Sequence, residues 1–106
     1  MGSDISKIDI SIAEQGIRSR IERIDTIQVN MHFLYNTINN ALNYVDENGE
    51  SMLENRLLEP SQIVLASECI YSVLKAIPSE MHIDVMRRFL TNMLEIHLHP
   101  EKFNIV

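Results

Sequence analysis

Residues 17–45 read IRSRIERIDTIQVNMHFLYNTINNALNYV, and this stretch decides the fold class. An apolar residue recurs at every seventh position, at Ile17, Ile24, Met31, Ile38 and Val45. The position after each of them is polar. A seven-residue apolar repeat with a polar flank is typical of a helix that packs along one seam. The pattern predicts a long, coiled-coil-like helix over residues 11–45, about 50 Å in length.

The remaining sequence predicts three more helices. Ser51 has capping-box spacing to Glu54, which predicts a short helix that Pro60 ends. Residues 61–77 are apolar over most of a helical surface, so we expect a central helix that is covered on several sides. A last helix is expected over residues 80–98.

Composition supports an all-α chain. The chain has 106 residues with only 3 glycines and 3 prolines, so turns are scarce and the elements must be long. We expect a single helical domain over residues 1–106, with a flexible or extended arm at 1–10 and a C-terminal tail at 99–106. Its architecture would be a small helical bundle with one long N-terminal helix, a short helix and two packed C-terminal helices.

Charge and cysteine content restrict the function classes. The net charge of −6 disfavours nucleic-acid binding, because a phosphate backbone repels an acidic surface. The single cysteine, Cys69, forbids an internal disulfide and lies in an apolar stretch, where we expect it to be buried and inert. No apolar run approaches the length of a membrane span. We therefore expect a cytoplasmic protein without membrane contact.

One ten-residue string carries a resemblance. Residues 28–37, QVNMHFLYNT, resemble the phosphoacceptor segment of the sensor histidine kinases related to the autolysin regulators. The resemblance implies that His32 accepts the phosphoryl group, although Met31 stands where that family has proline. A separate histidine phosphotransfer domain would also fit the length and helical class. Tyr35 and Asn36 stand where such domains usually place a lysine and a small residue.

The sequence shows no other motif for catalysis, metal or cofactor. His97 and His99 are two positions apart, so on a helix their side chains would diverge instead of binding one metal ion. We expect no cofactor, no metal and no enzymatic activity. The chain is interpreted as a non-catalytic adaptor, chaperone or regulatory protein that acts by protein binding, with histidine phosphotransfer through His32 as the alternative.

Two apolar segments are candidate binding surfaces. The long seam would exceed the two later helices, which are about 25–30 Å long, so part of it should meet a protein partner or the second subunit of a C2 homodimer. The residues expected there are Ile17, Ile21, Ile24, Ile27 and Met31. The tail residues Phe103, Ile105 and Val106 should either fold back over the central helix or dock into a partner.

Overall fold

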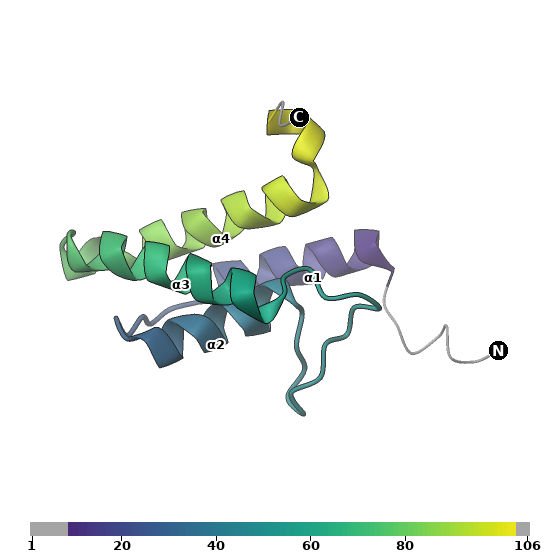
Figure 1. Cartoon of the computed structure of the whole chain (residues 1–106), viewed down its shortest axis with the longest axis horizontal. Coiled ribbons are helices and arrows are strands. Elements are labelled where there is room, and N and C mark those ends of the chain that lie inside the picture. Colours follow the sequence, from purple (N-terminus) through teal and green to yellow (C-terminus); the bar gives the residue numbers. More distant parts are fainter. Residues whose placement is uncertain (1–8, 104–106) are drawn as a thin grey trace.

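The computed structural model describes residues 9–103, in which four α-helices and no β-strand occur. The helices are α1 (Ile10–Glu22), α2 (Met31–Leu42), α3 (Pro60–Lys75) and α4 (His82–Leu98), with 3-10 turns η2 (Ser79–Met81) and η3 (Pro100–Phe103) (Figure 1). The all-α helical bundle is confirmed. The chain forms α1 and α2, then crosses a long loop to α3, and α4 returns beside α1.

The long N-terminal helix over 11–45 was a wrong prediction, because α1 ends at Glu22 and α2 begins at Met31. The side chain of Asn30 ends the connection by accepting the Phe33 N–H at 2.8 Å, an N-cap that fixes the start of α2. Residues 23–30 also include four β-branched side chains, which weaken helix propensity. The seven-residue repeat therefore belongs to two shorter helices.

A long-range contact holds the connection between α1 and α2 in place. Arg87 of α4 donates from Nε and Nη2 to the backbone oxygen of Ile24, at 3.1 and 2.7 Å. This carbonyl follows the last turn of α1, where backbone oxygens lack helical partners. Arg87 is half-buried, and its two hydrogen bonds stabilise the chain reversal.

The short helix expected after Ser51 is absent, and residues 43–59 form a loop in the structure. The buried side chain of Asn43 organises this loop, because its Nδ2 donates to the Leu58 oxygen at 3.0 Å and its Oδ1 accepts the Leu58 N–H at 2.8 Å. Ser51 Oγ donates to the backbone oxygen of Asn43 at 2.6 Å instead of capping a helix. Leu53 and Leu58 therefore reach the core from a loop.

The helix ends follow local chemistry. Pro60 occupies the first turn of α3, and the capping box there uses Glu59 and Gln62. Asp9 caps α1 by accepting the Ser11 N–H at 2.8 Å, so the helix begins inside the expected arm. Residues 1–8 of that arm lie outside the described residues.

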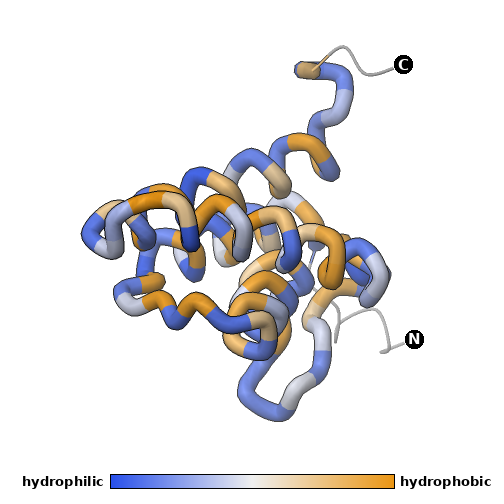
Figure 2. The backbone as a smooth tube through the Cα atoms, turned by 60° about the vertical axis from the view of Figure 1, so that its left-hand side comes forward, coloured by the Kyte–Doolittle hydropathy of each residue, from blue (hydrophilic) through white to orange (hydrophobic). Residues whose placement is uncertain are grey.

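One core is shared by all four helices and the loop. Apolar and polar positions alternate along each helix (Figure 2), and the apolar ones form this core. Its largest fully buried side chains are Ile17, Ile21, Leu34, Ile38, Leu42, Leu58, Ile63, Ile70, Leu74, Met86, Leu90 and Leu94. The helix expected to be central, α3, instead leaves one apolar side uncovered, which the next subsection describes.

Candidate functional site

An apolar groove runs between α3 and α4. Its walls are Leu65, Cys69 and Val73 of α3 and Val85, Phe89 and Met93 of α4; we call these six residues the α3/α4 groove. Two cavities, of about 330 and 200 Å³, lie along the contact between α3 and α4, and Phe89 lines both of them. Apolar concave surfaces of this kind are the usual binding places on helical proteins.

Helical periodicity explains why this side of α3 is open. Ile63, Ile70 and Leu74 face the core, whereas Leu65 and Val73 are eight positions apart and therefore share another face. The Leu65 side is left so open that 63% of the residue is exposed. An exposed leucine that belongs to a larger apolar surface marks a contact site more often than an isolated exposed leucine does.

Cys69 lies in the middle of the groove wall and is exposed. The expectation of a buried thiol was therefore wrong. Because α3 carries apolar residues on almost every side, its sequence cannot show which of them the core covers. The exposed thiol makes Cys69 a useful chemical probe of this surface.

One charged residue lines the groove, Arg88 of α4 in the smaller cavity. Glu68 and Lys75 of α3 are exposed outside the groove lining, and the Lys75 ammonium lies 5.1 Å from the centre of the Tyr71 ring. The hydroxyl of Ser72 donates to the Glu68 backbone oxygen at 3.2 Å, so this polar group is satisfied within the helix. The groove thus combines apolar walls with a positive charge at one end.

The predicted interface residues of the long seam occupy other places. Ile17 and Ile21 are buried in the core of the chain itself. Ile24 and Ile27 are half-buried against that core. Met31, at the start of α2, is 37% exposed. Because the seam is divided and mostly covered, the length argument for an interface on it no longer applies.

His32 lies on the exposed surface of α2, in its first turn. The Asn36 amide Nδ2 lies 3.1 Å from its Nε2. An exposed imidazole at this place could be reached by another protein. The free N–H groups at a helix N-terminus also favour a nearby negative charge.

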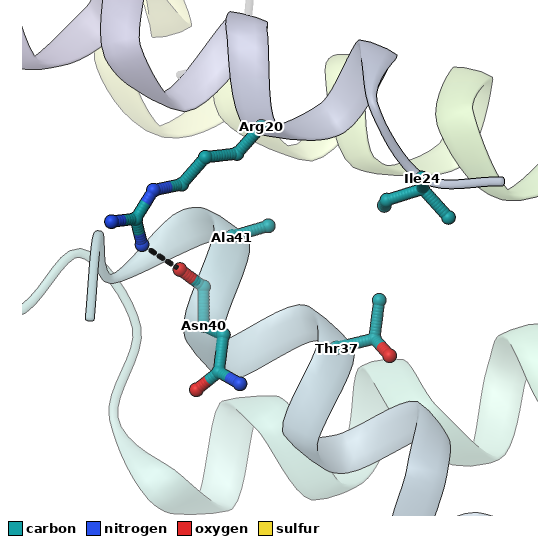
Figure 3. A pocket seen from close by; sticks show the side chains of 5 residues that line it. All are labelled: Arg20, Ile24, Thr37, Asn40 and Ala41. Carbon is teal, nitrogen blue, oxygen red and sulfur yellow. Dashed lines mark hydrogen bonds between the residues drawn. The ribbon is translucent and has the colours of Figure 1, made fainter. Parts of the chain in front are cut away.

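A cavity of about 340 Å³ lies between α1 and α2, lined by Arg20, Ile24, Thr37, Asn40 and Ala41 (Figure 3). Arg20 extends from α1 to the end of α2, where its Nη1 donates to the Asn40 oxygen at 3.0 Å and to the Val45 oxygen. Its guanidinium also lies over the Tyr44 ring, 4.5 Å from the ring centre. The Arg20 guanidinium is thus already bonded to backbone oxygens at the end of α2. We therefore describe this cavity as part of the packing between α1 and α2.

An ion network joins α1 to the end of α4. Arg18 pairs with Glu14 at 2.6 Å and with Glu95, and His99 Nε2 lies 3.4 Å from Glu14. The hydrogen bond from Arg18, helped by its positive charge and by His99, holds the pKa of the Glu14 carboxyl below its usual range. Sequence spacing did not reveal this cluster, because only the fold brings Glu14 beside His99.

This network is also the place where metal-ligating atoms meet. One ligand atom each from Glu14, Glu95 and His99 lies within 4.8 Å of the others. The guanidinium of Arg18 contacts both the Glu14 and the Glu95 carboxylate, so it neutralises the negative charge that would otherwise attract a metal cation. The network is therefore described as a structural contact between α1 and α4.

The C-terminal tail is described as far as Phe103. This residue lies in η3, which packs on α4, and it is 43% exposed. Ile105 and Val106, the other two residues of the expected docking tail, lie outside the described residues. Phe103 does not cover the α3/α4 groove, whose lining residues all come from earlier in the chain.

Within residues 9–103, every helix is too short or too polar to cross a bilayer. Comparisons of the chain with protein-family models, with curated proteins and with solved structures found no significant match.

Proposed function

We propose that the chain is a non-catalytic, cytoplasmic protein-binding module of the adaptor, chaperone or regulatory kind, and that the α3/α4 groove binds an amphipathic helix. The observation that carries the proposal is the apolar groove with the exposed residue Leu65 at its edge. A helix laid into such a groove buries its own apolar face and covers the exposed one.

The size of the groove fits a short helix. α3 has 16 residues and is therefore about 24 Å long, which matches four turns of a bound helix. Leu65 and Phe89 would supply much of the buried apolar area, at about 25 cal/mol for each Å² removed from water. The charge of Arg88 would select and orient the partner more than it would add affinity.

Two matched substitutions test the groove. Leu65→Glu places a carboxylate in the groove wall, while Val64→Glu places the same charge one residue away, at a 42% exposed position that does not line the groove. Affinity capture from the native host, followed by mass spectrometry, would identify proteins held by the unmodified chain. Each captured protein would then be purified and titrated calorimetrically against all three forms.

The expected result is a partner that binds the unmodified chain and Val64→Glu with similar affinity and binds Leu65→Glu at least tenfold more weakly, since burying an unpaired carboxylate costs well over 1 kcal/mol. Circular dichroism should show equal helicity for the three forms. Equal affinity of a partner for Leu65→Glu and the unmodified chain would contradict a groove-based function.

Histidine phosphotransfer through His32 is a second candidate, favoured by the exposure of this imidazole at the first turn of α2. A small phosphodonor such as phosphoramidate would be incubated with the chain and with His32→Gln. The candidate predicts an acid-labile phosphate on the unmodified chain that is absent from His32→Gln. If neither form is labelled, by the small donor or by a kinase from the host, His32 has no phosphoacceptor role.

A further inference from the structure

We infer that the outer face of α3, which forms one edge of the α3/α4 groove, packs against α3 of a second copy of this chain, antiparallel in a C2 dimer. This inference rests on the proposed function and names the partner of the same site. It starts from the outer face of α3, where four residues follow the spacing of a helical seam.

The four seam residues are Leu65, Cys69, Ser72 and Ala76, separated by four, three and four positions. All four are exposed. Spacing of this kind places residues in one line along a helix and lets two helices pack with a small crossing angle. The seam borders the groove through Leu65 and Cys69, which belong to both.

An antiparallel pair brings these residues into complementary layers. Leu65 would lie opposite Ala76 of the second copy, and Cys69 opposite Ser72. The short side chains allow close approach, and the Ser72 hydroxyl already donates to the Glu68 oxygen, so its burial leaves no unpaired donor. The side chains of Val73 and Phe89, beside the seam, would then meet their counterparts from the second copy.

Charge complementarity selects this occupant and this orientation. Glu68 and Lys75 are exposed and seven positions apart, so they lie on the same side of the seam. In the antiparallel register, Glu68 of each copy lies beside Lys75 of the other, which gives two equivalent ion pairs. In a parallel pair, the Glu68 and Lys75 side chains of the two copies would lie on opposite flanks of the seam, and no Glu68–Lys75 pair would form. The symmetry that a second copy supplies therefore satisfies both charges at once.

The oligomeric state of charge variants tests the register. Sedimentation equilibrium over a wide concentration range would be measured for the unmodified chain, Glu68→Lys, Lys75→Glu and the double exchange. Each single change replaces two attractive pairs with repulsive ones and should weaken dimerisation about fivefold to tenfold at low salt. The double exchange restores opposite charges and should return the dissociation constant to that of the unmodified chain.

Cys69 supplies a second, independent readout. It is the single cysteine of the chain, so any dimer formed by a bis-maleimide must join the two Cys69 residues. In the proposed register, the two thiols are offset by about 4.5 Å along the helix axis, within reach of a short linker. Cross-linking should be efficient in the unmodified chain and in Val64→Glu, and lost in Leu65→Glu.

The outcomes separate this inference from the proposed function. A dimer that Leu65→Glu leaves intact, or one that the double charge exchange does not restore, would overturn the second-copy occupant. A monomer at all concentrations that still binds another protein through Leu65 would also overturn it, while the proposed function stands. A monomer whose groove binds nothing would remove both. Equal helicity of all variants, measured by circular dichroism, excludes unfolding as the cause.

Discussion

Replacing Asn30 with alanine tests whether α1 and α2 are separate helices, because the two architectures predict opposite signs. In the structure, Asn30 Oδ1 accepts the Phe33 N–H at 2.8 Å, and removal of such an N-cap costs about 1 kcal/mol. In a continuous helix over residues 11–45, position 30 would be interior, where alanine is favoured over asparagine by about 0.5 kcal/mol. The two architectures therefore differ by about 1.5 kcal/mol.

The assay is urea denaturation followed by the helical circular dichroism signal. We expect a free energy of unfolding about 1 kcal/mol below that of the unmodified chain, which corresponds to a melting temperature lower by about 4–8 °C. Asn30→Asp keeps the acceptor and should stay within a few tenths of a kcal/mol. Gln28→Ala serves as an exposed control in the same connection. An Asn30→Ala form more stable than the unmodified chain would refute a helix start at Met31.

Three other perturbations follow from contacts in the structure. Asn43→Ala leaves the N–H and carbonyl of Leu58 without their partner. Denaturant titration should therefore show a free energy of unfolding that is lower by about 2–4 kcal/mol. A decrease below about 1 kcal/mol would mean that the loop does not depend on this side chain. Gly16→Ala would normally stabilise a helix by about 1 kcal/mol. At this position, however, the alanine Cβ would lie 2.9 Å from Tyr44 Cε1, so Gly16→Ala should lower the melting temperature. In a Tyr44→Ala background, where this clash is absent, Gly16→Ala should raise the melting temperature. The lowered pKa of Glu14 means that its stabilising contribution is present above its usual value of 4.5 and is lost as the pH falls through the lower folded value. The difference in unfolding free energy between the unmodified chain and Glu14→Gln, at most about 1 kcal/mol, should therefore shrink in acid; a constant difference would contradict the pairing.

The sequence was sufficient for the all-α class and for α3 and α4. Pro60 marks the start of α3, and Pro78 separates the two helices, because proline lacks the N–H that a helix interior needs. The seam over 17–45 misled because two short helices that face one core keep the same apolar repeat as one long helix. The break depends on the Asn30 cap and on Arg87, which comes from a distant part of the chain.

The candidate site was harder to predict than the fold. Leu65, Cys69 and Val73 have the same apolar character as their buried neighbours, and only the arrangement of α4 leaves them open. The network around Arg18 was hidden for another reason. Its partners Glu14 and Glu95 lie in the first and last helices, and sequence spacing carries no information on such pairs.

Two contacts that join α1 and the connection after it to α4 lead to an expectation about the order in which the chain folds. Arg87 and Ile24 are 63 positions apart, and Arg18 and Glu95 are 77 apart, so each contact closes a long loop. Loop closure costs entropy before such contacts can form, whereas α2 and α3 meet across a shorter loop. We expect α2 and α3 to associate first and α1 to dock last, so backbone amides of α1 should exchange with solvent faster than those of α3. Transient release of α1 would expose Ile17 and Ile21 to solvent, with residues 23–30 as the hinge. We expect that α1 could then exchange between two chains, which is a route to misassembly.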